Sequence, residues 1–334
     1  MKQKLSTALL EAQVFKASRA HLEKNGFIEI FPPRVVRASG ACENVNTLFE
    51  VSSNKDFAWF GVPKNHQAYL AQTGQLYLEA FVPYLNKVYC VGPSFRAEPG
   101  NDNRHLTEFQ MIEIEFAGGF DELLKHIESF IYAIVQNIIK LPVGEQRAMG
   151  LGDADIKRLA GVKPIFPKIN YDEAIKKLGL VWGDDISSKK EAELVAQFDG
   201  HPIFITRYPD PMWNHGKEIE VEKFFNMLPD PENPGLVLSA DLILPIAGEA
   251  VGSAARIDNP EILVNRLLQS KMFKRLVAMG GSMEDFQWYI ERSKEKMVSH
   301  AGCGFGMSRI LRWIGGADDI KKAVTFPSNQ HHII

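Results

Sequence analysis

Apolar residues recur at a helical spacing in two long stretches of the chain. In residues 5–25 the repeating apolar positions are Leu9, Leu10, Phe15, Ala17 and Leu22, and Gly26 follows them as a helix-ending residue. In residues 120–140 they are Leu123, Leu124, Ile127, Ile131, Ile134, Val135 and Ile138, and Asp121 can cap the stretch. Both patterns predict a long helix that buries one face against a core.

Shorter runs rich in β-branched and aromatic residues predict strands. Residues 27–31 form one such run, which ends at two prolines. Residues 87–91 and 109–116 form two more. The turn residues from Pro99 to Asn103 lie between these two runs, so we expect an antiparallel hairpin with a long polar connection.

Three further stretches carry strand signals. Residues 68–79 are expected to form a strand that runs into a helix, with Thr73 as its N-cap. Residues 201–209 are expected to form a strand that enters a turn, and residues 236–256 to contribute two strands. The charged stretch 213–222 shows no such pattern and is expected to be a loop.

Charged residues gather at the hairpin, and two interpretations fit them. The group consists of Arg96, Glu98, Arg104, His105, Glu113 and Glu115. Alternation along a strand places Glu113 and Glu115 on one face. Arginine is the side chain that grips phosphate through two N–H groups, so the cluster suits a nucleotide triphosphate above an amino acid. A solvated hairpin with cross-strand salt bridges would show the same spacing.

Composition limits the class of protein. The 334 residues are 45% hydrophobic and 24% charged, with a net charge of −3, as in ordinary globular proteins. The sequence has no run of 18 apolar residues, so no membrane span is expected. Cys42, Cys90 and Cys303 have no metal-site spacing and indicate a reducing, cytoplasmic location. The small net charge gives no overall nucleic-acid signal.

Three segments, in order along the chain, resemble the three motifs of the class II aminoacyl-tRNA synthetases. FRAE and RHLTEF, which flank the hairpin loop, resemble motif 2, and the following MIEIE resembles the aspartyl/asparaginyl branch. FIEIFPP at residues 27–33 resembles motif 1, and GCGFGMSR at residues 302–309 resembles motif 3. The resemblance implies an α+β fold: an antiparallel sheet of about six strands flanked by helices, homodimeric through motif 1.

The resemblance also implies a site for ATP and Mg²⁺. The residues implied in ATP binding are Arg96, Glu98, Arg104, His105, Phe109, Glu249 and Arg309. Arg96 would bridge the α-phosphate and the reacting carboxylate, and Arg309 would contact the γ-phosphate; both are implied as catalytic. Phe109 would stack on adenine, with Glu98 near its amino group. Asp241 and Glu249 would carry magnesium, which prefers hard oxygen ligands.

The implied amino-acid pocket belongs to the asparaginyl type. Its residues are Glu43, Gln75, Glu79, Glu113, Glu115 and Arg256. Glu43 would hold the substrate ammonium, and Arg256 would grip a side-chain oxygen. Leu78 stands where aspartyl enzymes have a lysine. The pocket is therefore expected to take a neutral carboxamide, or aspartate with its β-carboxylate turned toward ATP.

We expect one catalytic domain over residues 1–334, with a less certain inserted segment at about 141–235. Motif 1 begins within the first 35 residues, which leaves no room for the family's anticodon-binding domain of ~100 residues. A free-standing core of this kind resembles archaeal-type asparagine synthetases. The favoured hypothesis is thus an ATP-dependent, AMP-forming ligase that activates aspartate or asparagine as an acyl-adenylate and transfers it to ammonia.

Other functions stay open at this point. The chain could be an asparagine–tRNA ligase-type enzyme or an asparagine-activating amino-acid or peptide ligase; tRNA is a possible but not favoured partner. A non-catalytic paralog that binds amino acid or nucleotide is disfavoured, because Arg96, Arg309, Asp241 and Glu249 are all present. The absent domain favours aspartate, whereas the segment QLYLE at residues 75–79 favours asparagine.

Overall fold

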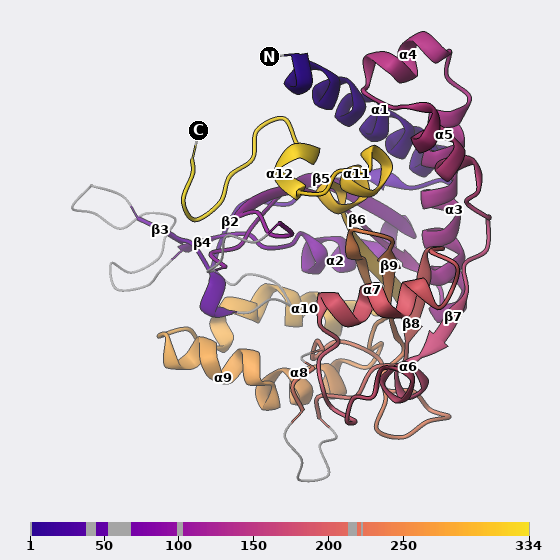
Figure 1. Ribbon diagram of the computed structural model, residues 1–334. Helices are drawn as coiled ribbons and strands as arrows, with labels where there is room; N and C mark the ends of the chain where they lie inside the picture. Colours follow the sequence, from indigo (N-terminus) through magenta and orange to yellow (C-terminus); the bar gives the residue numbers. More distant parts are fainter. Residues whose placement is uncertain are drawn as a thin grey trace.

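A large, mostly antiparallel sheet organises the computed structural model, which describes residues 2–37, 45–52, 68–98, 103–212, 219–221 and 223–333 (Figure 1). Within these residues the sheet has eight strands, and only β1 with β5 and β7 with β8 pair in parallel. In spatial order the strands are β1 (Ile28–Glu29), β5 (Lys87–Phe95), β6 (Glu108–Ala117), β11 (His300–Gly306), β10 (Gly248–Ala255), β9 (Ser239–Leu244), β8 (Ile203–Thr206) and β7 (Lys168–Asn170).

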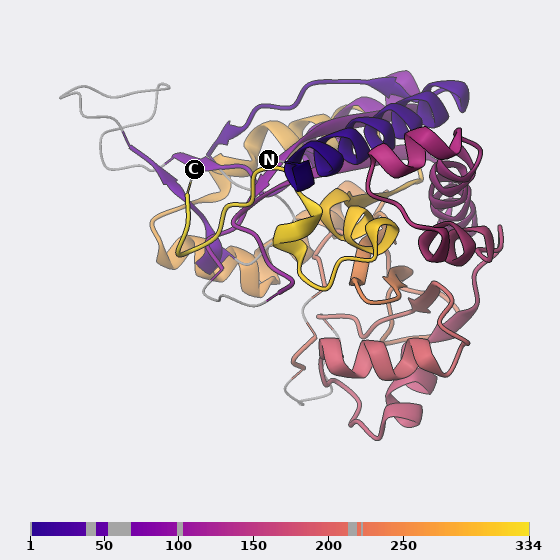
Figure 2. The same ribbon diagram turned by 45° about the horizontal axis from the view of Figure 1, so that its top comes forward.

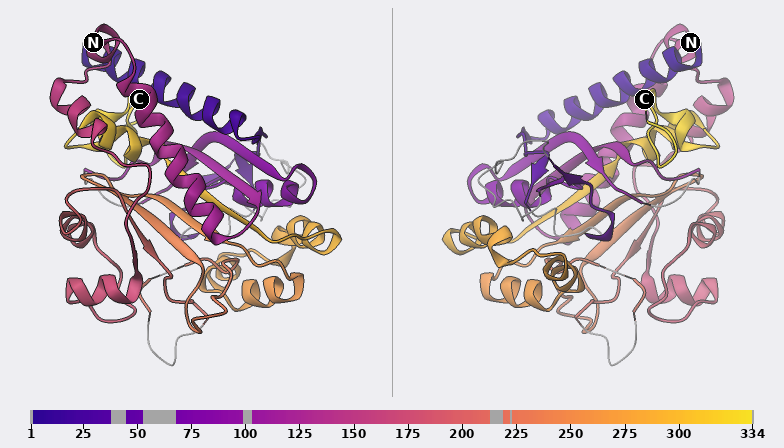
Figure 3. Two further views of the ribbon diagram at one scale, coloured as in Figure 1. Left: turned by 90° about the vertical axis from the view of Figure 1, so that its right-hand side faces the viewer. Right: turned by 90° about the vertical axis from the view of Figure 1, so that its left-hand side faces the viewer.

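Helices cover one face of this sheet and form the main core with it (Figure 3). The covering helices are α1 (Lys2–Lys24), α3 (Phe120–Ile139) and α11 (Met307–Gly315). Phe130 of α3 stacks on Phe305 of β11, with ring centroids 4.0 Å apart. The two ends of the chain lie on the same side of the molecule (Figure 2), where the Thr325 N–H donates to Glu11 of α1 at 3.0 Å.

Smaller elements surround the sheet. A three-stranded sheet has the order β2 (Val35–Val36), β4 (Ala68–Leu70) and β3 (Glu50–Val51). The remaining helices are α2 (Gln75–Leu85), α4 (Val143–Ala148), α5 (Asp153–Ala160), α6 (Tyr171–Leu178), α7 (Ser188–Ala196), α8 (Pro260–Gln269), α9 (Lys271–Ala278), α10 (Gln287–Glu295) and α12 (Ile320–Ala323), with 3-10 turns at Val45–Thr47 and Met283–Phe286. In the parts of the chain just described, no helix has the length and apolar character needed to span a membrane.

The expected fold class and the central hairpin are confirmed. β5 and β6 pair antiparallel from Lys87 with Phe116 to Phe95 with Glu108. The sheet has more strands than the expected six, because the segment 141–235 supplies β7 and β8. The glycine-rich run of motif 3 forms strand β11 before its helix begins.

Three local predictions need correction. β1 contains only two of the five residues expected, since Phe31 is followed by prolines that lack the N–H a strand needs. The N-cap position of α2 is Gly74 rather than Thr73; the Thr73 hydroxyl accepts from the Gln75 N–H at 3.0 Å and donates to the Glu113 carboxylate. The N-cap of α3 is Gly119; Asp121 lies in the first turn, where its charge favours the helix dipole.

Strands β11 and β6 approach so closely at Gly302 that a side chain at this position should destabilise the protein. A Cβ at this position would lie 2.1 Å from the Glu115 carboxyl group and 2.3 Å from the Ile114 carbonyl oxygen of β6. Because a backbone atom cannot rotate away, Gly302→Ala should lower the free energy of unfolding by about 1–3 kcal/mol or more. Urea denaturation followed by circular dichroism measures this.

The matched control is Gly144→Ala, at an exposed position in α4 with nothing within 4 Å of the new Cβ. It should be neutral or stabilise slightly, because alanine has the higher helix propensity. Equal unfolding midpoints for the two variants would contradict the proposed packing of β11 against β6.

Candidate active site

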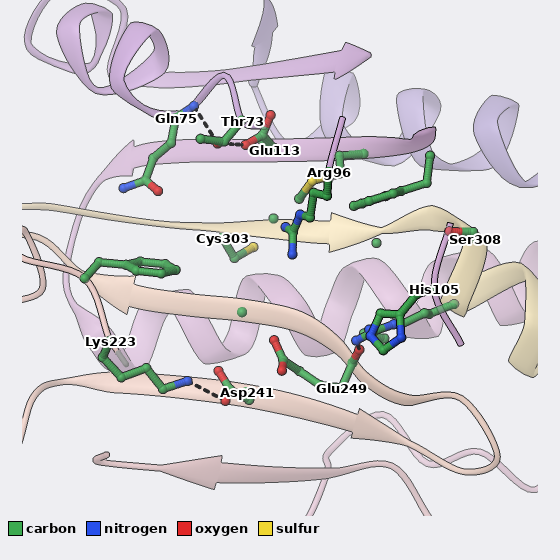
Figure 4. Close-up of a pocket in the computed structure, with 18 of the residues that line it drawn as sticks. Thr73, Gln75, Arg96, His105, Glu113, Lys223, Asp241, Glu249, Cys303 and Ser308 are labelled. Carbon is green, nitrogen blue, oxygen red and sulfur yellow. Dashed lines mark hydrogen bonds and ion pairs between the residues drawn. The ribbon is translucent and has the colours of Figure 1, made fainter. Parts of the chain in front are cut away.

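A cavity of about 360 Å³ lies on the face of the sheet opposite the main core (Figure 4). Strand β6 shows why the two faces differ. Ile112, Ile114 and Phe116 belong to the core, whereas the alternate residues line the cavity, namely Phe109, Met111, Glu113 and Glu115. The period of two along a strand thus separates an apolar face from an acidic one.

The cavity brings together most residues that the sequence predicts. Of the predicted set, its lining contains Gln75, Arg96, Glu98, Arg104, His105, Phe109, Glu113, Glu115, Asp241, Glu249, Arg256 and Arg309. Glu43 lies outside the described residues, and Glu79 lies outside the lining. Residues from β6, β9, β10, β11 and α11 therefore line one cavity. The most distant pair of predicted residues in it, Gln75 and Arg309, is 234 positions apart in the chain.

Cationic groups gather at one end of the cavity. The Arg96 guanidinium lies over the Phe109 ring at 5.2 Å, and Glu98 lies 3.8 Å from both Arg96 and His105. The Arg309 guanidinium donates to the Glu249 carbonyl. Burial lowers the pKa of Arg309, yet a guanidinium keeps its charge throughout the physiological range. This end can therefore bind an anion with several oxygens, such as a polyphosphate.

Arg104 has a partner that the sequence pattern does not reveal. Its Nη2 atom lies 2.8 Å from Oε2 of Glu191, on helix α7. Burial raises the pKa of Glu191 to about 7, although the neighbouring Arg104 opposes the shift. Eight residues of the segment 141–235 line the cavity, none of which belongs to the predicted site; the four polar ones are Asp185, Glu191, Tyr208 and Lys223. This segment forms a wall of the cavity as well as an edge of the sheet.

Asp241 and Glu249 fit a divalent cation. A Cβ at Gly252 would lie 3.4 Å from Oε1 of Glu249 and 3.9 Å from Oδ1 of Asp241, so both oxygens face the space above this glycine. The other oxygen of Asp241 lies 2.6 Å from the Lys223 ammonium (Figure 4). Burial raises the pKa of Asp241 to about 6 against the effect of Lys223. Hard oxygens in this arrangement are the ligands that magnesium prefers.

The opposite end of the cavity is rich in carboxylates. Glu113 accepts a hydrogen bond from the Gly74 N–H at 2.8 Å and another from the Thr73 hydroxyl. Glu115 lies 2.6 Å from Nη2 of Arg256, and both side chains are buried. Burial raises the pKa of Glu115 to about 7, with Arg256 acting against it. The only guanidinium among the lining residues at this end is thus already ion-paired.

Glu79 lies behind Arg256 and holds several groups in place. Its two oxygens accept hydrogen bonds from Gln75 at 2.6 Å, Asn226 at 2.7 Å and Tyr289 at 2.5 Å. Arg256 Nε lies 3.9 Å away. Glu79, Glu115 and His300 are close enough to share a metal ion, but the Arg256 guanidinium already contacts both carboxylates and would repel one. Glu79 therefore does not line the cavity itself but holds Gln75, a lining residue, in place through a hydrogen bond.

Leu78 does not face the cavity. It is fully buried in a hydrophobic cluster with Val82, Val88 and Cys90. A lysine at this position would place an ammonium among apolar side chains at a cost of several kcal/mol. Its chain position next to Glu79 is therefore not a guide to the charge of the pocket.

Comparisons with known proteins agree with this geometry. The family tRNA synthetases class II (D, K and N) matches residues 1–330. The asparagine–tRNA ligase of Pelotomaculum thermopropionicum is 34% identical over 325 residues, which cover 95% of this chain and 67% of that protein. The crystal structure of asparaginyl-tRNA synthetase from Pyrococcus horikoshii complexed with asparaginyl-adenylate has a TM-score of 0.82 and 32% identity, over 99% of this chain and 70% of that one.

A eukaryotic structure gives the same result. Asparaginyl-tRNA synthetase from Entamoeba histolytica, in complex with asparaginyl-adenylate, has a TM-score of 0.77 and 28% identity over 99% of this chain and 68% of that one. The chain thus spans about two thirds of the length of these relatives. With three motifs in order and their residues around one cavity, the chain belongs to the class II tRNA synthetase family, whose members are ATP-dependent, AMP-forming ligases.

Proposed function

We propose that this protein activates asparagine with ATP to form asparaginyl-adenylate and pyrophosphate, and then transfers the asparaginyl group to tRNA. The observation that carries the choice of amino acid is the buried Arg256–Glu115 pair at 2.6 Å. The names of the relatives, which are asparagine–tRNA ligases, support both the amino acid and the acceptor.

The charge of the amino-acid pocket favours a carboxamide. Arg256 offers one positive charge, and Glu115 and Glu113 present two carboxylates to the same end of the cavity. A carboxamide can accept from the guanidinium through its oxygen and donate to a carboxylate through its NH₂ group. A β-carboxylate would gain the same contact with Arg256 but would be repelled by Glu113 and by the ionised form of Glu115. Asparagine is therefore the better fit.

The basic end of the cavity suits the nucleotide. In the proposed reaction the asparagine α-carboxylate attacks the α-phosphorus of ATP, and pyrophosphate leaves. This chemistry needs no side-chain nucleophile, because it depends on positioning and on neutralising developing charge. Arg96 would bridge the α-phosphate and the carboxylate, while Arg104, His105 and Arg309 would hold the outer phosphates.

The remaining contacts of the nucleotide follow from the same lining. Phe109 would stack on adenine, and Glu98 would accept from its amino group. Asp241 and Glu249 would hold magnesium, which when bound supplies charge neutralisation at the phosphates.

The proposed acceptor is tRNA and not ammonia, which the sequence alone favours. The sequence alone favours ammonia as the acceptor, with aspartate as the amino acid, through the resemblance to asparagine synthetases. The matched relatives do not support ammonia as the acceptor, and they favour the alternative, an asparagine–tRNA ligase-type enzyme. The charge of the pocket points in the same direction, since the neutral side chain is preferred.

The surface around motif 1 supports the expected homodimer. β1 is an edge strand of the large sheet, and Ile28 in it is 47% exposed. Phe31 and Val35, which follow, are 86% and 39% exposed. Large exposed apolar side chains on an edge strand and in the segment that follows it are typical of a site of association. We propose that a second copy of the chain covers this edge.

The proposed function is tested by comparing two reaction mixtures, one with tRNA and one with ammonia as the acceptor. Incubation with ATP, asparagine and tRNA should yield AMP and asparaginyl-tRNA, identified by mass spectrometry after nuclease digestion. Incubation with ATP, aspartate and ammonia should yield no asparagine. Free asparagine from the second mixture, with no product in the first, would overturn the proposal.

Removal of Arg96 should abolish activation without unfolding the protein. Its side chain lies in the cavity against Phe109, where it would contact two reacting anions. Arg96→Ala should slow asparagine-dependent ATP–pyrophosphate exchange by about two to three decades, the loss typical of a transition-state hydrogen-bond donor. Arg147→Ala, in exposed α4, is the control and should exchange normally. Near-normal exchange by the Arg96 variant would refute the assigned role.

The dimer is tested by placing a charge on the exposed edge. Phe31→Asp should shift the protein from dimer to monomer in sedimentation velocity at micromolar concentration, because it buries a carboxylate in an apolar contact. Ile165→Asp alters an apolar residue that is 70% exposed elsewhere and should leave the dimer intact. A wild-type protein that sediments as a monomer would rule the dimer out.

A further inference from the structure

Helix α7 belongs to the segment 141–235, outside the three motifs (Figure 1), and it carries a residue that lines the cavity beside Arg104. α7 contacts β9 and β10, the strands that carry Asp241 and Glu249. Its residue Glu191 is buried, which is uncommon for a carboxylate, and it lines the cavity. A buried carboxylate in this position needs a partner, and that partner is Arg104 at 2.8 Å.

The contact holds Arg104 between three elements. On one side is Glu191 of α7. On another is Gly248, at the start of β10, where a Cβ would lie 2.3 Å from Nη2 of Arg104 and 2.5 Å from Oε2 of Glu191. The backbone just before Arg104 is also fixed, because the Asn103 carbonyl accepts from the Ile320 N–H at 3.0 Å.

Gly248 is adapted to this arrangement in two ways. Its φ of +75° lies in the left-handed region that favours glycine, and its missing side chain leaves the room that the ion pair occupies. An arginine side chain has several rotatable bonds, and holding it in one orientation before the ligand arrives removes an ordering cost from binding.

We propose that Glu191 is a positioning residue for ATP: it orients the Arg104 guanidinium toward the outer phosphates through their ion pair. The inference rests on the proposed function only in taking ATP as the ligand and Arg104 as a contact of its β- and γ-phosphates. Glu191 itself does not touch the nucleotide. Through Glu191 the segment 141–235 contributes to nucleotide binding, in addition to the residues of the three motifs.

The proposal predicts an effect on ATP and not on AMP, because AMP lacks the outer phosphates. In isothermal titration calorimetry with magnesium present, Glu191→Gln should bind ATP about tenfold more weakly, the cost of one charge-assisted hydrogen bond. AMP binding should be unchanged. The control is Glu193→Gln on the same helix, where Glu193 is 47% exposed and paired with Lys190; both nucleotides should bind it normally.

A double-mutant cycle tests whether Glu191 acts through Arg104. Arg104→Ala should itself weaken ATP binding, and adding Glu191→Gln should cause no further loss. Equal weakening of ATP and AMP, an additive loss in the double variant, or tighter ATP binding by Glu191→Gln would each overturn the proposal. The last result would show that the carboxylate competes with phosphate for Arg104.

These measurements are independent of the amino acid and of the acceptor. Asparagine-dependent pyrophosphate exchange by the wild-type protein, assayed in parallel, tests the proposed function separately. If the wild-type protein binds ATP but shows no exchange, the proposal that it activates asparagine is wrong. The calorimetry would still test the role of Glu191.

Discussion

The buried ion pair between Arg256 and Glu115 connects two strands that are not neighbours in the sheet. Glu115 lies on β6 and Arg256 directly follows β10, with β11 between them. The pair can form because Gly302, opposite Glu115 on β11, has no side chain to fill the space. Removing one partner of such a pair typically costs about 3–5 kcal/mol, yet a hydrophobic replacement of both is often neutral. Its place in the cavity therefore points to recognition rather than stability.

The same principle of matched charge extends along the cavity. Lys223 balances Asp241 at 2.6 Å, and Glu191 balances Arg104 at 2.8 Å. Each pair leaves part of a charged group facing the cavity, where a ligand of the opposite sign can reach it. The acidic end then suits an ammonium and a carboxamide, and the basic end a triphosphate. The cavity therefore has an acidic end and a basic end because different strands and loops of the sheet carry the acidic and the basic residues.

The sequence predicts those parts of the site that lie within one motif. The hairpin could be predicted because its strands, loop and charged residues are close in the chain, and alternation alone places Glu113 and Glu115 together. Glu191 could not, because it meets Arg104 across 87 positions and its local pattern is that of a surface helix. The Thr73 hydroxyl accepts from the Gln75 N–H at 3.0 Å, as a local helix-start signal implies, but its bond to Glu113, 40 positions away, could not be predicted from the local pattern. The surroundings of Leu78 could not be predicted either, because Gln75 and Leu78 are three residues apart and share a helix face, and only the packing of Leu78 with Val88 and Cys90 of β5 takes it out of the cavity.

The central claim is that the charge around Arg256 selects a neutral side chain. The most direct measurement compares two stable mimics of the adenylate, the sulfamoyl adenosines that carry asparagine and aspartate, by isothermal titration with the wild-type protein. Because like charges brought together cost several kcal/mol, the asparagine compound should bind at least about a hundredfold more tightly. Equal affinity, or tighter binding of the aspartate compound, would contradict the account.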